Sequence, residues 1–468
     1  MTTLQPTASW AERTAQHTGL GVYLLGIVAF GVSASRSETG TGWVVAVVIA
    51  VGLTARGAIL HRPLTATHVT AAIVCLLLAC LGYADGRPHL GFVLVVVSGW
   101  VLVWPVPSVP QPEEYPRIEA LVQRTAGDPL APFALNSAKS YFFDPSGTAA
   151  IAYRTRAGIA VVSGDPIGDA RAFGNLPTRF TTFAEARGWR VAVLAASEHT
   201  ARLWQNRVDG RSPLRAVDIG CDVVVDVTRF SLDGRRFRNL RQAVQRSRNA
   251  GVSTEILSER DVSAALRGQL FEIVAETRGG HQRRGFSMIL DHLLDGVLPG
   301  MMIVVARDRH GRPVGFQRYG TAHHKNEWSL DVPWRSARAP NGTDERMVVD
   351  VVEHVRRRGG TSVSLAFAPF PRLFSDTGTG VRQRMLRTTL RLGSSVIALE
   401  SLYRYLHKFH AAAGRRYVLF GPRYVVPAAY AMLASEFVPH REHSPRRDSR
   451  RSGRNRHGST PAGRRTLS

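Results

Sequence analysis

The fold of this chain is decided by the stretch SLDGRRFRNLRQAVQRSRNAG (Ser231–Gly251), which predicts an arginine-rich amphipathic helix. At about 100° per residue, Phe237, Leu240 and Val244 fall on one apolar stripe. Gly251 stands where a helix commonly ends in a left-handed residue. An apolar stripe of this kind indicates that the helix packs on a folded core and leaves its arginines outside.

The arginines of this helix divide into two groups. Arg235, Arg238 and Arg246 point away from the apolar stripe, where ordinary solvated charge is a sufficient explanation. Arg241 and Arg248 border the stripe, and we expect each to find a carboxylate or a phosphate, because a charge beside a core needs a partner.

The whole chain carries a formal net charge of +24 over 468 residues. Lysine occurs only at positions 139, 325 and 408, so 57 of the 60 basic residues are arginine. Arginine binds phosphates through two parallel hydrogen bonds, although a GC-rich genome would also raise its frequency. The excess charge predicts an anionic partner.

The N-terminal quarter predicts membrane helices. Four stretches contain no Asp, Glu, Lys or Arg, and each is long enough to cross a bilayer: Thr14–Ser35, Thr39–Ala55, Pro63–Ala84 and Pro88–Pro112. We expect about four spans, with three spans and one re-entrant segment as the alternative. Cys75 and Cys80 lie in the third stretch and Cys221 lies alone, which predicts neither disulfides nor a thiolate metal site.

Arginines flanking the expected spans suggest the orientation of the protein. Arg13, Arg56, Arg62 and Arg117 would share one side of the membrane, against Arg36 and Arg87 on the other. Because basic residues favour the cytoplasmic side, we expect a multi-pass cell-membrane protein whose large C-terminal region is cytosolic.

After the proline-rich exit PVPSVPQPEEYP, apolar runs alternate with amphipathic segments, which indicates an α/β region of two lobes. The expected strands are 149–154, 159–163, 190–195, 222–227, 301–307, 314–319, 328–332 and 362–367, and the expected helices are 177–187, 237–250, 261–277, 343–358 and 395–412. We predict a transmembrane domain at 1–110, a first lobe with the Arg-rich helix at 116–250, a second lobe at 251–436, and a disordered basic tail at 437–468.

Several segments resemble one known family, in the family's order. They are FFDPSGTAAIAYRTRAGIAVVSGDPIG (142–168), GRRFRNLRQAVQRSRNAG (234–251), RRGFSM (283–288), SLDVPWRSARAPNG (329–342), LAFAPF (365–370) and SLYRYLHKFHAAAGRRYVLF (401–420). Together they are similar to the C-terminal catalytic domain of bacterial phosphatidylglycerol lysyltransferases, over roughly residues 116–436.

The resemblance implies an N-terminal helical membrane domain followed by tandem acetyltransferase-like (GNAT-like) lobes. It also implies transfer of an amino acid from aminoacyl-tRNA to the glycerol hydroxyl of phosphatidylglycerol, which would change envelope charge and weaken attraction of cationic antimicrobial peptides. Aminoacyl-tRNA, an anionic phospholipid and the membrane are the expected partners, and no cofactor is expected. The amino acid transferred, the acceptor lipid and the oligomeric state stay open.

The same resemblance assigns roles to individual residues. Asp331 and Arg335 match the family's catalytic Asp and Arg with one extra residue between them, although a salt bridge at a strand end would also explain them. The expected substrate-binding residues are Arg238, Arg241, Arg248, Asp344, Glu345, Lys408, Arg416 and Tyr417. The two acids begin a helix, where its dipole favours them in any case.

Two alternatives come from other functional classes. An acyl-CoA-dependent transferase needs a phosphate-binding loop, for which QHTGLG from Gln16 and QRYGTA from Gln317 are formal matches in unsuitable places. A non-catalytic membrane protein that binds anionic lipid or RNA needs only the basic surface. No Gly-Lys dipeptide, HExxH or GxSxG occurs, and the sixteen histidines show no metal-ligand spacing, so no metal site is predicted.

Overall fold

The computed structural model describes residues 10–35, 41–59, 66–206, 214–277, 288–369, 405 and 408–437. Most of the segment 283–288, the start of the segment 401–420, most of the helix expected at 395–412, and the tail after Phe437 lie outside these residues.

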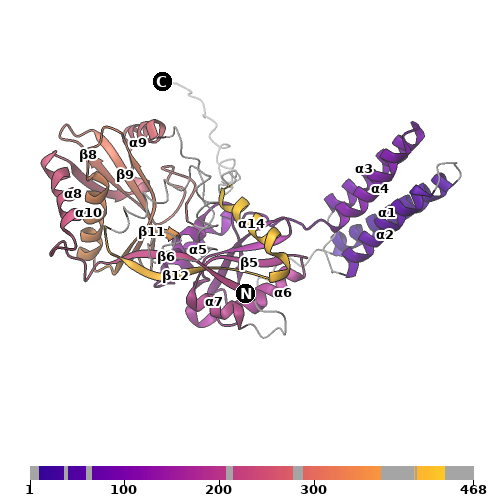
Figure 1. Ribbon diagram of the computed structural model, residues 1–468, viewed down its shortest axis with the longest axis horizontal. Helices are drawn as coiled ribbons and strands as arrows, with labels where there is room; N and C mark the ends of the chain where they lie inside the picture. The colour runs from indigo at the N-terminus through magenta and orange to yellow at the C-terminus, as the bar shows by residue number, and fades with distance from the viewer. Residues whose placement is uncertain are drawn as a thin grey trace, which may run out of the picture.

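Four long helices form at the four uncharged stretches: α1 (Trp10–Ser35), α2 (Gly42–Ile59), α3 (Ala66–Ala84) and α4 (Pro88–Val103). They pack as a bundle beside the rest of the molecule (Figure 1), in which α3 contacts α1 and α4 while α2 contacts α4. Gly99 permits the close approach of α4 to α2, because a Cβ there would lie 2.8 Å from the Cα of Ala50.

Within the described residues, one helical segment, Thr67–Ala84, is both long and apolar enough to cross a membrane. Three shorter apolar helical segments accompany it, at Gly21–Val32, Gly42–Gly57 and Pro88–Val103. The structure thus has a helix at each stretch where the sequence predicts a span.

The rest of the chain is built on one mixed sheet of 12 strands, in the order β1-β2-β3-β5-β12-β6-β11-β10-β9-β8-β7, with β4 beside β2. Only β3–β5 and β10–β11 pair in parallel among these neighbours. The strands are β1 (Ser140–Phe143), β2 (Ala149–Arg156), β3 (Ile159–Ser163), β4 (Ile167–Gly168), β5 (Arg190–Ser197), β6 (Arg215–Asp226), β7 (Ser253–Ser258), β8 (Met301–Arg307), β9 (Pro313–Ala322), β10 (Glu327–Arg335), β11 (Ser362–Pro369) and β12 (Ala412–Phe420).

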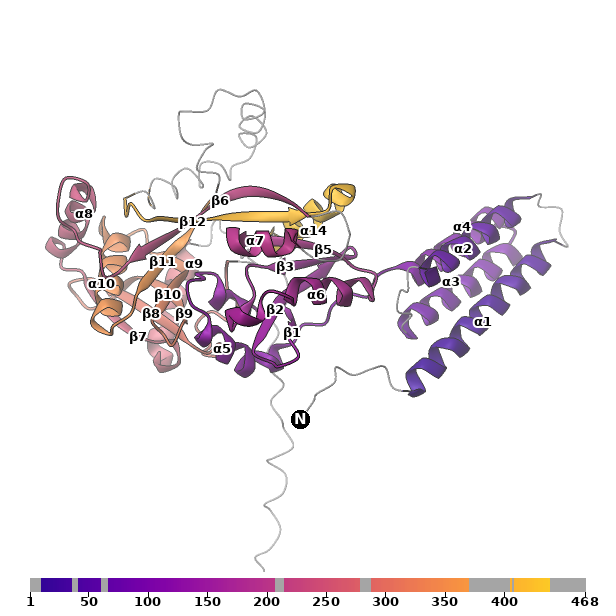
Figure 2. The same cartoon turned by 90° about the horizontal axis from the view of Figure 1, so that it is seen from below.

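Helices cover both faces of this sheet (Figure 2). In the half made by β1–β5, α6 and α7 cover one face, while α5 and α14 pack on the other. In the half made by β7–β11, α8 and α10 cover one face and α9 covers the other. Their bounds are α5 (Tyr115–Arg124), α6 (Leu176–Glu185), α7 (Glu198–Gln205), α8 (Arg238–Asn249), α9 (Ala264–Thr277), α10 (Thr343–Arg357) and α14 (Val425–Phe437).

Short 3₁₀ turns complete the described chain: η1 (Pro112–Glu114), η2 (Ala131–Leu135), η3 (Ala170–Ala172), η4 (Glu259–Asp261) and η5 (Pro422–Tyr424). The Arg-rich helix forms as predicted, since Leu240 and Val244 are buried against α10 and β6 and Phe237 packs beside them.

The C-terminal segment enters the sheet away from its neighbours in sequence. β12 lies between β5 and β6, and α14 then packs on β3. No strand was predicted at 412–420, and the expected boundary at 250 assigned both elements to the second lobe. We therefore propose that 412–437 be grouped with the half that begins at residue 116.

Candidate functional site

A cleft of about 610 Å³ opens where the two halves of the sheet meet. Its walls come from the loop after α5, the β3–β4 loop, the start of α7, and strands β6, β10, β11 and β12. Among the residues that the structure describes, the carboxylates that line it are Asp128, Asp165, Glu198, Asp222 and Glu327, and the arginines are Arg415 and Arg416. The cleft is therefore acidic in a strongly basic protein.

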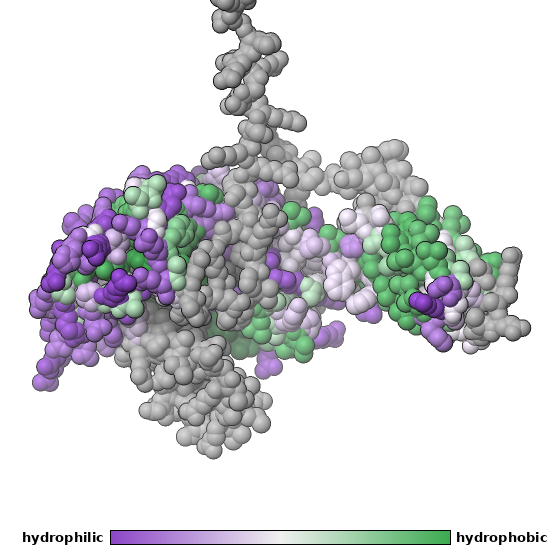
Figure 3. All heavy atoms as spheres, turned by 90° about the horizontal axis from the view of Figure 1, so that it is seen from above, coloured by the Kyte–Doolittle hydropathy of each residue, from purple (hydrophilic) through white to green (hydrophobic). Residues whose placement is uncertain are grey.

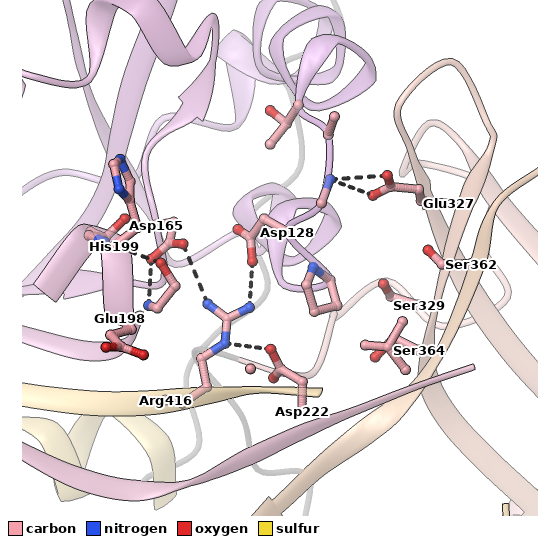
Figure 4. A pocket seen from close by; sticks show the side chains of 18 of the residues that line it. Asp128, Asp165, Glu198, His199, Asp222, Glu327, Ser329, Ser362, Ser364 and Arg416 are labelled. Carbon is pink, nitrogen blue, oxygen red and sulfur yellow. Dashed lines mark hydrogen bonds and ion pairs between the residues drawn. The ribbon is translucent and has the colours of Figure 1, made fainter. Parts of the chain in front are cut away.

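Three of these carboxylates surround Arg416, which is only 2% exposed (Figure 4). Its Nη2 lies 2.6 Å from Oδ1 of Asp128, and its Nε lies 2.7 Å from Oδ2 of Asp222. Its Nη1 lies 3.7 Å from Oδ2 of Asp165. We call these four residues the carboxylate cage. One guanidinium among three carboxylates leaves a surplus of negative charge when all three are ionised.

The pKa values of the cage residues are shifted from their ordinary values. Burial raises the pKa of Asp222 to about 6, although Arg416 opposes this shift, and burial with the nearby Asp128 also raises the pKa of Asp165. Burial disfavours the charged form of Arg416, but the three carboxylates outweigh it and raise its pKa. Oδ2 of Asp128 is buried without a hydrogen-bond partner among the described residues. The cage thus has capacity for a further cation.

The opposite wall is contributed by β10 and β11. Glu327 accepts the backbone N–H of Gly127 with both carboxylate oxygens, each at 3.0 Å. Burial raises the pKa of Glu327 above its ordinary value. Ser329, Ser362 and Ser364 line the same wall (Figure 4). A carboxylate of raised pKa beside hydroxyl groups suits proton transfer.

The predicted catalytic residue Asp331 lies in a fully buried ion cluster. Its Oδ2 is 3.1 Å from Nη1 of Arg318, whose Nη2 is 2.9 Å from Oε2 of Glu259, and all three side chains are 0% exposed. Oδ1 of Asp331 accepts the N–H of Leu290 at 2.7 Å. Burial raises the pKa of Asp331 to about 6 despite the attraction of Arg318. This placement favours a positioning role for Asp331 over contact with a substrate.

The other expected residue of the pair, Arg335, is directed to the start of α10. Its Nε lies 3.4 Å from Oδ2 of Asp344. Next to it, Nζ of Lys408 lies 2.8 Å from Oε1 of Glu345. The structure therefore brings together Arg335, Asp344, Glu345 and Lys408, while Asp331 pairs elsewhere. Burial raises the pKa of Asp344, and its Oδ1 has no hydrogen-bond partner among the described residues.

Gly342 places this cluster against the Arg-rich helix. It caps α10 with φ +92°, and a Cβ there would lie 2.0 Å from the backbone oxygen of Ala243 in α8. We predict that Gly342→Ala lowers the free energy of unfolding by more than about 2 kcal/mol, because left-handed strain adds to the clash.

The control for this prediction lies at the other end of α10. Gly359 has φ +76° with no atom within 4 Å of its Cβ position, so Gly359→Ala should cost only about 1 kcal/mol of strain. Denaturant titration of the detergent-solubilised chain measures both variants. Equal losses would show that α8 and α10 do not approach this closely.

The remaining predicted residues are dispersed. Arg238 and Arg248 are exposed on α8. Arg241 donates to the backbone oxygen of Leu232, so its partner is a carbonyl and the expected carboxylate or phosphate is not needed to satisfy it. On β12, Arg416 faces the cleft, whereas Tyr417 packs with the core on the opposite face. Lys408, Arg416 and Tyr417 therefore do not form one phosphate cradle.

Four acids of the cleft were not predicted from the sequence, namely Asp128, Asp165, Asp222 and Glu327. A signal for two of them exists, because the tripeptide Gly-Asp-Pro occurs at 127–129 and again at 164–166. Both glycines have positive φ, 75° and 72°, so each tripeptide forms a tight turn that presents its aspartate to the cleft.

The sheet and its helices define an α/β protein of acetyltransferase-like (GNAT-like) fold. It is similar to two solved structures: the C-terminal domain of a putative lysylphosphatidylglycerol synthetase from Agrobacterium fabrum (TM-score 0.60, 24% identity, 71% of this chain and 99% of that one) and L-PGS from Bacillus licheniformis (TM-score 0.59, 20% identity, 70% and 97%).

The family described as "Phosphatidylglycerol lysyltransferase, C-terminal" matches residues 119–420, and this chain belongs to it. An MprF-like domain protein of Mycobacterium tuberculosis is 46% identical over 403 residues, which is 86% of this chain and 83% of that protein. The lysylphosphatidylglycerol biosynthesis bifunctional protein LysX of Mycobacterium avium is 33% identical over 306 residues, 64% of this chain. This chain spans only 25% of that protein.

Proposed function

We propose that this protein transfers an aminoacyl group from aminoacyl-tRNA to the glycerol hydroxyl of phosphatidylglycerol. The observation that carries the proposal is the acidic cleft in a chain of net charge +24. An aminoacyl ester carries a cationic ammonium group on an anionic nucleic acid, and the acceptor is an anionic lipid. A basic exterior with an acidic interior is complementary to such a pair of substrates.

The reaction exchanges one ester for another. The glycerol oxygen attacks the aminoacyl carbonyl carbon, and the bond from that carbon to the ribose oxygen of the tRNA breaks. The hydroxyl proton passes to a base and then to the departing ribose oxygen. In the proposed site, the carboxylate cage holds the ammonium group and Glu327 accepts the proton.

The sequence-predicted residues keep supporting roles in this proposal. Asp344 and Glu345 would hold a cationic amino-acid side chain, with Arg335 and Lys408 balancing their charge. The exposed arginines of α8, including Arg238 and Arg248, would dock the tRNA phosphates at the end of the molecule far from α1–α4 (Figures 1 and 2). Asp331 would position β10 through Arg318.

The membrane arrangement is also a proposal, with four crossings by α1–α4 and a cytosolic catalytic region. The outward-facing side chains of these helices are apolar: Val22, Leu25, Val28, Val45, Val48, Ile59, Leu77, Leu81 and Val93 are all exposed. Figure 3 shows the hydrophobic surface gathered over these helices and the hydrophilic surface over the opposite end. Such an apolar exterior is expected of a bundle surrounded by lipid.

The acyl-CoA alternative finds no support at Gln317. This side chain is fully buried in β9, and its Oε1 accepts the hydroxyl of Tyr319 at 2.8 Å. It therefore does not begin a helix that would bind a pyrophosphate.

The proposal is tested by mass analysis of lipids from cells that express the chain. We expect a new aminoacylated phosphatidylglycerol, and Glu327→Gln should reduce its rate of formation roughly 10²-fold or more, as loss of a general base does. Glutamine keeps an acceptor for the N–H of Gly127, so the fold is preserved.

Glu255→Gln is the matched control, since Glu255 is exposed on β7 and forms a surface ion pair with Arg307. It should leave lipid formation unchanged. No new lipid from membrane-inserted protein, with charged tRNA and phosphatidylglycerol present, would reject the transferase and favour a protein that only binds anionic lipid or RNA.

A further inference from the structure

Two arginines of β2 each have an unsatisfied buried nitrogen, as far as the described residues show, in a part of the molecule that the proposed reaction does not use. Nη1 of Arg154 and Nε of Arg156 are buried and have no hydrogen-bond partner among the described residues. Burial, followed by the positive charge of Arg156, lowers the pKa of Arg154 to about 10, and no described carboxylate offsets the effect. Two half-buried guanidiniums two residues apart, without a carboxylate partner among the described residues, favour the approach of an anion.

The sheet register places a third arginine on the same face. Arg154 lies opposite Val161 and Arg156 lies opposite Ile159. Ile159 is in turn paired with Arg190, which is exposed at the start of β5. Paired residues of neighbouring strands point to the same side of a sheet, so Arg154, Arg156 and Arg190 flank one patch.

Helix α14 packs over that patch, and its own outer side is exposed. Its inner side, Ala428, Ala431 and Met432, packs on Ile159 and Val161. Its outer side presents Val426, Tyr430 and Leu433, at spacings of four and three residues, and these are 79%, 59% and 57% exposed. A helix that is apolar on all sides is normally buried on all sides, so the outer side has no apolar partner within the described part of the chain.

The same patch adjoins the point where the chain leaves the helical bundle. A second cavity, of about 260 Å³, is lined by Trp100 and Trp104 from the end of α4, by Arg190, and by Tyr424 and Pro427 at the start of α14.

The linker after α4 is fixed to the sheet beside the arginines. Thr155 donates its N–H to Oγ of Ser108 at 3.1 Å, and Nε1 of Trp189 donates to the carbonyl of Val106 at 2.8 Å. Tryptophan and tyrosine concentrate at membrane–water interfaces. Helix α14 lies at the end of the sheet toward the bundle (Figures 1 and 2).

We infer that Arg154, Arg156, Arg190 and the outer side of α14 form a docking surface for the bilayer, in which the arginines bind the phosphates of anionic phospholipids. Val426, Tyr430 and Leu433 enter the interface between head groups and acyl chains. This docking surface is separate from the cleft, and it rests on the proposed insertion of α1–α4 in a membrane. It would hold the soluble region close to the bilayer that supplies the acceptor lipid.

The experiment uses the full chain with Cys75, Cys80 and Cys221 replaced by serine, reconstituted in vesicles with and without phosphatidylglycerol. A nitroxide at Leu433→Cys reports whether that position meets lipid, through its relative accessibility to oxygen and to a water-soluble nickel complex. A label at Leu25→Cys on α1 gives the accessibilities expected in lipid, and a label at Phe271→Cys on the distant α9 gives those expected in water. Both residues are exposed. We expect Leu433→Cys to resemble Leu25→Cys when phosphatidylglycerol is present.

Replacing Arg154, Arg156 and Arg190 by glutamine should shift the docking equilibrium about a hundredfold toward the water-exposed state, given about fivefold for each arginine. The charge-matched control replaces the exposed Arg309, Arg312 and Arg357 of the other half by glutamine, and should retain docking.

The outcomes separate this inference from the proposals on which it rests. A water-exposed label at 433 beside a lipid-exposed label at 25 overturns the docking surface alone. The docking surface is also overturned if the two arginine triplets change docking equally. It is overturned as well if tRNA, at the same phosphate concentration as the lipid, releases the label at 433 from the bilayer. A water-exposed label at 25 rejects the membrane insertion of α1–α4, and so removes the basis of the inference. A docked label without aminoacylated lipid supports the docking surface and counts against the transferase.

Discussion

Replacing Arg318 by methionine is expected to lower the free energy of unfolding by about 3–5 kcal/mol. The guanidinium is fully buried and holds Glu259 and Asp331, and it also donates to the backbone oxygens of Asp291 and His292 at 3.0 Å each. Methionine fills a similar volume but leaves two buried carboxylates without a cation. The expected loss of stability comes from leaving two buried carboxylates unpaired. It is larger than the net stabilisation that the intact ion cluster provides.

Arg307→Met provides the matched control on the neighbouring strand β8. Its guanidinium lies 3.1 Å from the exposed Glu255, and exposed pairs contribute roughly 0.2–1 kcal/mol. Denaturant titration of both variants in detergent measures the difference. A loss below about 1 kcal/mol for Arg318→Met would show that the buried cluster of Glu259, Arg318 and Asp331 is not formed in solution.

Arg416→Met is expected to destabilise the protein by a similar amount at neutral pH, about 3–5 kcal/mol, and less at acidic pH. The variant keeps Asp128, Asp165 and Asp222 buried together without their cation. Burial already raises the pKa of Asp222 to about 6, and loss of the arginine would raise it further. Raised folded pKa values mean that the folded state binds protons more tightly than the unfolded state. Stability therefore increases as pH falls below these values and decreases as pH rises through them.

The measurement is the free energy of unfolding of wild type and variant between pH 5 and pH 8. The deficit of Arg416→Met should be larger at the upper end of this range. Arg415→Met is the control, because Arg415 is exposed and lies 3.9 Å from Asp218, so its loss should change stability by about 0.5 kcal/mol or less. A deficit independent of pH would show that loss of Arg416 does not raise the pKa values of the cage carboxylates in the folded protein.

Local pattern was sufficient to predict much of the fold. The apolar stripe of Leu240 and Val244 predicted which side of α8 is buried, and the helix expected at 343–358 forms as α10. Both signals lie within a few turns of one helix, where side-chain spacing directly determines which residues share a face. The family was likewise recognisable from short ordered segments.

Contacts across the sheet could not be predicted in this way. Asp331 and Arg335 lie on one strand, but the register shifts between Leu330 and Val332, so that Asp331 meets Arg318 and Arg335 meets Asp344. The carboxylate cage joins Arg416 to Asp128, residues 288 positions apart. No periodicity in the sequence encodes a contact between segments so far apart, and only the sheet order brings them together.

The position of β12 has a consequence for how the protein is made. Strands β1–β6 are synthesised early, but in the order of the described strands β5 and β6 are joined through β12, residues 412–420. During translation the edges of β5 and β6 that face β12 would therefore stay unpaired until residues 412–420 have left the ribosome. By then α1–α4 have long emerged from the ribosome. A chain that inserts them in the membrane first would therefore complete its sheet while α1–α4 already anchor it there. A chain truncated just before residue 412 contains every residue of β1–β6 but lacks the strand that joins β5 to β6. We therefore expect this truncated chain to aggregate through the unpaired edges of these two strands.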